Sequence, residues 1–253
     1  MNTFLNADHP LITAMLSSDT DEGMMNKINL SVEQGAEAIC FLTESLMPEY
    51  KSEESIKKII KTAQNRPVYV TNYIRNNSQP DLSDEVLATE LLCMTDYGAS
   101  LIDIRTDMFC RSSNEVTHDV FAVKKQKELI SQIHQSGCDV LMSAHVFRHI
   151  SPEATLEIAL LQQERGADIA KVVTFADNEK EADDAFRTLF LLKEKLDIPF
   201  LFLCSGGCCK KHRLLSPLLG NCMYLCVENE KTDAPQPTIA QAKSLLKGFE
   251  KYE

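Results

Sequence analysis

The sequence has no apolar run long enough to span a membrane, and its N-terminus, MNTFLNADHP, lacks the basic start and apolar core of a secretory leader. Positive charge is also scarce: 26 Lys and Arg residues stand against 37 Asp and Glu residues, for a formal net charge of −11. Nucleic acids and anionic membranes are bound through basic faces, so this balance argues against both as partners. An anionic small molecule would have to be held by local cations inside a site.

Linkers, low-complexity tracts and blocks of like charge are missing as well. We therefore expect residues 1–253 to form one domain, a length that suits a single α/β barrel. The nine cysteines are odd in number, scattered and partly placed in apolar runs, which is typical of reduced thiols in the cytoplasm. Cys208, Cys209, Cys222 and Cys226 match no common zinc spacing, so we expect no metal site.

Strand-like apolar runs alternate with helical patterns along the chain. We expect strands at 11–15, 38–42, 67–73, 100–105, 139–147, around Lys171, 199–204 and 222–227. Helical patterns end at Gln34 and cover 53–64, 83–97, 120–135, 152–165 and 179–195, with a short helix near Arg213 and a last one from Thr238. This alternation predicts an α/β fold, a single (β/α)8 TIM barrel. A doubly wound open sheet is the alternative, but no Gly-x-Gly-x-x-Gly follows a predicted strand.

The segment 166–173, GADIAKVV, has the apolar character of a buried parallel strand, yet Lys171 lies in its middle. An ammonium group there suffers a large desolvation cost unless it is paired or neutralised. A lysine whose pKa is lowered is a good amine nucleophile towards a carbonyl carbon. The alternative is that Lys171 lies at the strand's end and points to solvent or a salt bridge. This stretch alone does not decide between the two.

The neighbouring predicted strand adds a histidine. Active sites of α/β barrels lie at the C-terminal ends of the strands. Ser143 and His145 share one face of the strand before that of Lys171, and Asp103 and Arg105 share a face of an earlier strand. A lone strand histidine is more often structural, but a lysine and a histidine on adjacent strands bring an amine nucleophile and a proton-transfer group to one carbon.

These residues resemble the type I 3-dehydroquinate dehydratases. The likeness rests on segments 166–171, 143–147 with Pro152, and 101–104, and on Arg213 after a glycine-containing loop. It implies a (β/α)8 barrel, commonly a homodimer, that uses neither metal nor organic cofactor. It implies that Lys171 forms an imine with the ketone of an anionic keto-acid substrate. His145 would move protons during a syn loss of water that gives 3-dehydroshikimate, and Arg213 would hold the substrate carboxylate.

The substrate-binding positions depart from the family pattern. The Glu-x-Arg-x-Asp of strand two is reduced to Glu44, and the Asp-x-Glu of strand four reads Asp103-Ile104-Arg105. The arginine that ends strand three falls near Tyr73, with Arg75 two residues on. The glutamate that orients the histidine would fall at Asn76-Asn77, where there is no carboxylate. The remaining candidates for substrate binding are Arg213, Asp103, Arg105, Glu44, Arg75, Tyr73, Ser143 and Gln236.

Three functions therefore remain open. The first is a Schiff-base dehydratase acting on 3-dehydroquinate or a related cyclic hydroxy-keto acid. The second is a class I aldolase-like enzyme, which needs only the lysine and an acid/base. The third is a catalytically silent binding or regulatory protein, favoured by the missing carboxylate partner of His145. A barrel without turnover has no evident reason to keep a lysine in an apolar strand, so the third ranks last.

Overall fold

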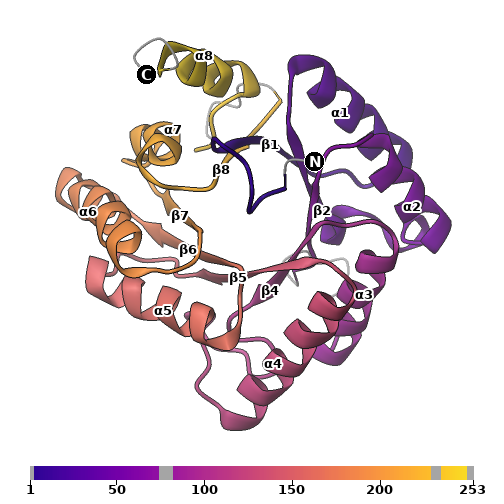
Figure 1. Ribbon diagram of the computed structural model, residues 1–253, viewed down its shortest axis with the longest axis horizontal. Helices are drawn as coiled ribbons and strands as arrows, with labels where there is room; N and C mark the ends of the chain where they lie inside the picture. The colour runs from indigo at the N-terminus through magenta and orange to yellow at the C-terminus, as the bar shows by residue number, and fades with distance from the viewer. Residues whose placement is uncertain (1–2, 74–81, 229–234, 250–253) are drawn as a thin grey trace.

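The computed structural model of the protein describes residues 3–73, 82–228 and 235–249. The described residues contain eight parallel strands that alternate with eight α-helices, and Figure 1 shows the helices as a ring around the strands. The strand order is β7-β6-β5-β4-β3-β2-β1-β8, and a bridge between Phe200 and Asn221 joins the two ends of the wall. The predicted (β/α)8 barrel is confirmed.

The strands are β1 (Leu11–Leu16), β2 (Ala38–Leu42), β3 (Val68–Thr71), β4 (Leu101–Arg105), β5 (Asp139–His145), β6 (Ile169–Phe175), β7 (Phe200–Ser205) and β8 (Met223–Cys226). The helices are α1 (Asp21–Gln34), α2 (Glu53–Thr62), α3 (Asp84–Asp96), α4 (Val120–Gln135), α5 (Pro152–Arg165), α6 (Glu179–Lys195), α7 (Lys210–Leu219) and α8 (Ile239–Phe249). Two 3-10 turns, η1 (Thr43–Ser45) and η2 (Pro48–Tyr50), follow β2. The described helices lack the combination of length and apolarity that crossing a membrane requires.

The helix boundaries follow local side-chain chemistry. Six helices begin after a residue whose side-chain oxygen accepts a hydrogen bond from the first turn, namely Thr20, Ser52, Ser83, Asp119, Ser151 and Asn178. Helix α5 ends at Gly166, whose φ of 100° is a left-handed value that glycine adopts without a Cβ clash. The chain then enters β6, the strand that carries Lys171.

Alternation along the strands divides the core into an inner and an outer layer. Leu101, Leu141, Ile169 and Leu201 belong to one buried cluster inside the barrel. The residues next to them in sequence pack outward against the helices. Because the period is two, Lys171 follows Ile169 into the interior, and Asp103, Ser143 and His145 follow Leu101 and Leu141. The fold therefore places the polar candidates inside an apolar barrel.

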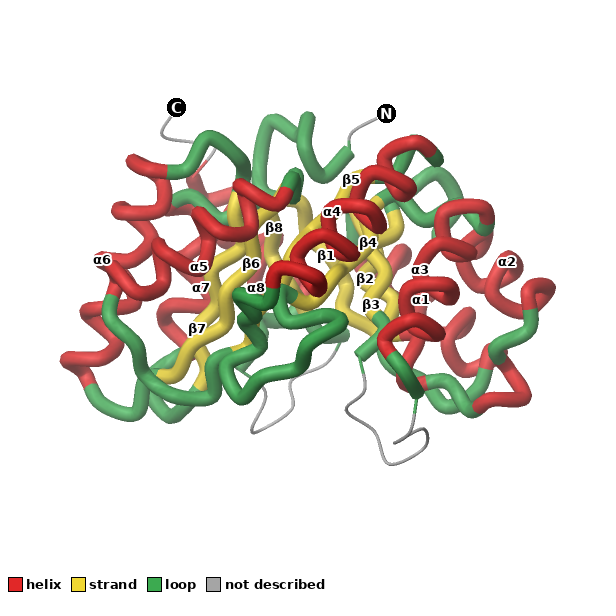
Figure 2. The backbone as a smooth tube through the Cα atoms, turned by 90° about the horizontal axis from the view of Figure 1, so that it is seen from below, coloured by secondary structure: helices red, strands yellow, loops and turns green. Residues whose placement is uncertain are grey.

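The N-terminal segment covers one opening of the barrel. Phe4 is buried in the interior cluster, with Leu5 and Ala7 packed against it, and its ring meets that of Tyr69 edge-on at 6.3 Å. Figure 1 shows this segment across the centre of the barrel, and Figure 2 shows it on one side of the strands. A cavity inside the barrel is consequently reached from the other opening, where the strands end.

His212 lies in the apolar layer between α7 and its neighbours. It is fully buried, and its ring packs 5.4 Å from that of Phe186 and 5.2 Å from that of Phe202. Burial, and then the charge of Arg213, lower the pKa of His212 from 6.5 to about 3. The folded protein therefore keeps this imidazole neutral in mildly acid solution, whereas the unfolded chain protonates it.

This burial predicts a specific acid sensitivity. Because the folded pKa lies below the unfolded one, the unfolded state takes up the proton first as the pH falls from 6.5 towards about 3. The free energy of unfolding should fall in that window by up to about 1.4 kcal/mol per pH unit through this residue alone. His212→Phe should remove the dependence, measured as the difference between urea-unfolding curves of variant and wild type. The exposed His118→Gln is the control, and parallel pH curves for His212→Phe and wild type would contradict the assignment.

Candidate active site

Lys171 lies in the middle of β6 with its amine inside the barrel. Its side chain is only 6% exposed, and Nζ donates hydrogen bonds to Tyr69 Oη at 2.9 Å, Tyr73 Oη at 3.0 Å and Asp103 Oδ2 at 3.1 Å. The interpretation that Lys171 points to solvent is wrong. The ion pair considered with it is present, because Asp103 is the counter-ion. A buried ammonium with a buried carboxylate is the arrangement that the desolvation cost demands.

Asp103 is held by four side chains. Tyr69 and Tyr73 both donate their phenolic hydrogens to Oδ2, and Ser143 donates to Oδ1 at 2.5 Å. The fourth partner is Lys171, which is adjacent to Ser143 in the register of β5 and β6. Burial, with the Asp103 charge second, raises the pKa of Tyr69 well above its usual value, so this phenol remains a donor. The carboxylate is thus solvated by protein groups in place of water.

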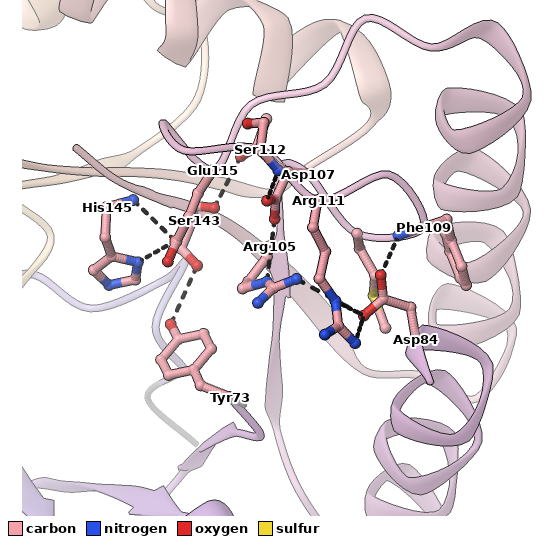
Figure 3. Close-up of polar contacts among 12 residues, drawn as sticks. Tyr73, Asp84, Arg105, Asp107, Phe109, Arg111, Ser112, Glu115, Ser143 and His145 are labelled. Carbon is pink, nitrogen blue, oxygen red and sulfur yellow. Dashed lines mark hydrogen bonds and ion pairs between the residues drawn. The ribbon is translucent and has the colours of Figure 1, made fainter. Parts of the chain in front are cut away.

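His145 ends β5, two residues beyond Ser143 and nearer the mouth of the barrel. Its ring Nδ1 lies 2.6 Å from Glu115 Oε2, and its backbone N–H donates to the same oxygen at 3.0 Å (Figure 3). The expectation that no carboxylate partners the histidine is therefore wrong. The partner comes from the loop between β4 and α4, whereas the family pattern places this glutamate in the loop after β3. A carboxylate on Nδ1–H leaves Nε2 as the basic nitrogen of the ring.

Two sets of contacts hold the loop that carries Glu115. Arg165, a buried residue of α5, donates to Thr106 O at 2.7 Å and to Thr117 O at 2.5 Å, near the two ends of the loop. Burial lowers the pKa of Arg165 from its usual value, without altering its role as a donor. Glu115 itself has φ of 52°, a left-handed value that costs a non-glycine residue on the order of 1 kcal/mol and needs support from its surroundings.

Arg105 belongs to the second set of contacts. Its guanidinium lies 3.2 Å from Asp107 and 3.8 Å from Asp84 at the start of α3, and Asp84 also pairs with Arg111 at 2.9 Å (Figure 3). These charges fix the first turn of the loop against α3. Arg105 is absent from the pocket lining, so the structure does not bring it together with the other candidates.

A pocket of about 450 Å³ opens inside the barrel at the C-terminal ends of the strands. Six of the candidates line it, namely Lys171, His145, Tyr73, Glu44, Arg213 and Gln236. Asp103 and Ser143 do not line the pocket: Asp103 accepts from the Lys171 amine, and Ser143 donates to Asp103. Arg75 lies outside the described residues.

Tyr73 connects the lysine to the histidine. Its hydroxyl accepts from Lys171 at 3.0 Å, and its ring packs edge-on against that of His145 with centroids 5.3 Å apart. The two groups are therefore separated by one aromatic side chain in a common pocket.

Arg213 supplies a cation to the pocket from α7. The turn before this helix requires Gly206, since φ is 98° and a Cβ would lie 2.6 Å from Ala176 O. The guanidinium donates to Cys204 O at 2.5 Å and to Ser205 Oγ at 3.1 Å. Within the part of the chain that the structure describes, it has no carboxylate within 4.0 Å. Burial lowers the pKa of Arg213 to about 10, so it is charged at neutral pH and suited to an anionic ligand.

Glu44, in η1, is the carboxyl group among the described residues that line the pocket. It accepts a hydrogen bond from Thr71 Oγ1 at 2.9 Å, and burial raises its pKa. Among residues 3–73, 82–228 and 235–249, no group of three or more His, Cys, Asp or Glu side chains could hold a metal ion. The pocket thus contains an amine, an imidazole with its carboxylate, a cation and an acid.

The chain resembles known proteins along most of its length. The family model of type I 3-dehydroquinase matches residues 12–253. A 3-dehydroquinate dehydratase of Methanopyrus kandleri is 23% identical over 240 residues, which cover 93% of this chain and 98% of that protein. The family match confirms the resemblance drawn from the sequence.

Two solved structures have the same fold. The 3-dehydroquinate dehydratase of Geobacillus kaustophilus HTA426 has a TM-score of 0.83 at 16% identity, over 98% of this chain and 94% of that one. The type I 3-dehydroquinate dehydratase of Clostridium difficile, solved with covalent modified comenic acid, has a TM-score of 0.82 at 15% identity, over 98% of this chain and 96% of that one.

The contact between His145 and Glu115 predicts the tautomer of the ring. In the wild type we expect Nδ1 protonated and Nε2 basic near neutral pH. Glu115→Ala removes the acceptor and should shift the tautomer ratio by about 10-fold to 100-fold, as expected for a lost hydrogen bond to a charged group. Glu115→Gln keeps an acceptor oxygen and should retain the tautomer. The measurement is nitrogen-15 NMR of labelled histidine, with the exposed Glu128→Ala as control. An unchanged His145 spectrum in Glu115→Ala would refute the assignment.

Proposed function

The chain belongs to the type I 3-dehydroquinase family of hydro-lyases, and from this premise we propose that it removes water from 3-dehydroquinate or a related cyclic hydroxy-keto acid. The reaction would pass through an imine on Lys171, with His145 as general acid and base. One observation carries the proposal: a buried amine and a carboxylate-paired imidazole line the same pocket, with Tyr73 between them.

The first step makes the imine. The Lys171 amine has to be neutral to attack, and Asp103, at 3.1 Å, is the carboxylate positioned to take its proton. The nitrogen then bonds to the ketone carbon, whose oxygen becomes a hydroxyl. Loss of that hydroxyl as water leaves the cationic iminium. Tyr69 and Tyr73 already donate to Asp103 and accept from the amine, so they are placed to adjust their hydrogens as the proton moves.

The second step is the elimination itself. The iminium withdraws electrons from the adjacent carbon, so His145 Nε2 can remove a proton from that carbon and leave an enamine. The enamine electrons then expel the hydroxyl on the next carbon, and the same imidazole returns the proton so that it leaves as water. Hydrolysis of the remaining iminium releases the enone and restores the amine. Glu115 stabilises the imidazolium during this cycle, as a carboxylate on Nδ1 does.

Substrate binding requires a cation for the carboxylate, and Arg213 is the candidate that lines the pocket. Glu44, Tyr73 and Gln236 line it too, and we include them among the groups that contact the substrate. Asp103 and Ser143 act through the lysine, and Arg105 through the loop of Glu115. We further propose a homodimer, which the family resemblance supports. We also propose a cytoplasmic location, which the nine free cysteines support.

The two alternatives make different products. An aldolase-like enzyme would use the same Lys171 imine but release two fragments. A silent binding protein would hold the keto acid without turnover. The best support for a silent binding protein was the missing carboxylate partner of His145, and the contact with Glu115 removes that support.

Chemical trapping tests the imine. Incubation with 3-dehydroquinate followed by borohydride should add the reduced ligand to Lys171, located by peptide mass spectrometry, while an enone absorbing in the near ultraviolet forms in unreduced samples. Lys171→Ala should abolish both, and Lys180→Ala, at an exposed position on α6, should change neither. An adduct elsewhere, or none with any cyclic keto acid, would overturn the proposal.

Variants at Arg213 test the carboxylate contact. Arg213→Gln should raise KM by about 100-fold, the loss expected for a hydrogen bond between charged groups, and should affect kcat less. Arg213→Lys keeps the charge but not the planar fork, so its KM should lie between those of Arg213→Gln and the wild type. Steady-state rates of enone formation at varied substrate concentration provide KM and kcat. Equal KM for all three proteins would mean that the carboxylate is bound elsewhere.

A further inference from the structure

The pocket has an apolar wall that the proposed chemistry does not use. Six side chains that line it also belong to, or pack against, the single apolar cluster inside the barrel: Met15, Cys40, Leu42, Val173, Leu203 and Leu225. They come from β1, β2, β6, β7 and β8, which adjoin one another around the barrel except at the bridged seam. Five of them offer no hydrogen bond, and burial raises the pKa of the Cys40 thiol, which is a weak donor.

The hydrogen-bonding side chains gather on the opposite wall. Thr71 and Tyr73 come from β3 and its end, Glu44 from η1 and His145 from β5. Tyr69, also on β3, donates to Asp103.

The other polar lining residues, Ser17, Ser45, Ser205 and Gln236, lie at or beyond the ends of β1, β2, β7 and β8, towards the mouth of the pocket. Ser45 donates to Leu42 O at 2.6 Å, and Ser205 accepts from Arg213. Among the residues that the structure describes, the strands below the mouth are therefore polar at β3 and β5, and apart from Lys171 they are apolar from β1 and β2 around to β6, β7 and β8.

The two anchoring groups place a substrate against the apolar wall. A carbonyl carbon must reach Lys171 on β6, and a carboxylate must reach Arg213, whose guanidinium is fixed to Cys204 at the end of β7. The ring atoms between these anchors then pass Val173 and Leu203, with Leu225 next along the wall. A hydroxyl that faces such a wall loses its water without gaining a partner, which weakens binding by about tenfold or more for each group.

We infer that the substrate is a cyclic β-hydroxy ketone with one carboxylate whose ring carries fewer hydroxyl groups than 3-dehydroquinate, the bare ring carbons lying against β1, β2, β7 and β8. This inference rests on the proposed function and names the ligand class of the same pocket. Arg213 is the one guanidinium among the described lining residues, which suits one carboxylate, and the hydroxyl that leaves must lie towards His145 on the polar wall. The remaining carbons meet leucine, valine and methionine side chains.

The test compares two ketones that differ only in these hydroxyls. They are 3-dehydroquinate and its dideoxy analogue, 1-hydroxy-3-oxocyclohexane-1-carboxylate, which loses water to give a cyclic enone in the same way. We expect kcat/KM for the analogue to exceed that for 3-dehydroquinate by about tenfold or more, with a borohydride adduct on Lys171. Imine formation by each ketone with a simple amine in solution corrects for their intrinsic reactivity.

A variant of the wall provides the second measurement. Leu42→Ser adds a hydroxyl partner at the pocket and should reduce the preference for the analogue, whereas Leu30→Ser, at an exposed position on α1, should leave it unchanged. If both ketones are dehydrated and 3-dehydroquinate is equally good or better, the inference is overturned while the proposed function stands. If neither ketone forms an adduct on Lys171, the proposed function fails and the inference with it.

Discussion

The structure depends on one buried ion pair, between Lys171 and Asp103. Placing an ammonium inside a barrel of leucine and isoleucine costs several kcal/mol unless a counter-ion and hydrogen bonds replace the lost water. Asp103 supplies the charge, and Tyr69, Tyr73 and Ser143 supply donors that keep its carboxylate satisfied. In the proposed reaction the pair also fixes where chemistry can occur, because the four strands that hold it, β3 to β6, set the depth of the amine below the mouth of the pocket.

The loop after β4 takes a role that the family pattern assigns to the loop after β3. A histidine base requires only that a carboxylate reach Nδ1, and the loop it comes from is immaterial. Here Glu115 does so, in a left-handed backbone conformation that Arg165 and the charges around Arg105 help to hold. Arg105, which replaces a family glutamate on β4, therefore helps to position Glu115 through its ion pairs with Asp107 and Asp84.

The sequence was sufficient for the fold because the apolar period of each strand and the side-chain caps of six helices are local properties. It was sufficient also to single out Lys171, since a charge in the middle of an apolar strand is visible in eight residues, but the same stretch left open whether the amine was reactive or lay in a salt bridge. It failed for Glu115, because a loop glutamate thirty positions before its histidine has no periodic or spacing signal. Arg105 shows the same limit: strand parity directs it towards the site, but Asp84 at the start of α3 and Asp107 just after β4 pair with its guanidinium outside the pocket.

In the proposed reaction, the division of the pocket wall into a polar and an apolar arc allows the substrate positions to change while the imine chemistry is kept. Imine chemistry requires an amine and a proton acceptor to meet the substrate carbonyl. The side chains that hydrogen-bond the Lys171 amine and the His145 ring come from β3 and its end, from β4 and from the Glu115 loop. The leucines of β2, β7 and β8 touch none of the hydrogen bonds that hold the amine. Replacing polar side chains by apolar ones on β2, β7 and β8 removes hydrogen-bond partners for some ring substituents of the substrate. The ion pair between Lys171 and Asp103 stays intact. The proposal thus assigns substrate choice and imine chemistry to different arcs of one barrel.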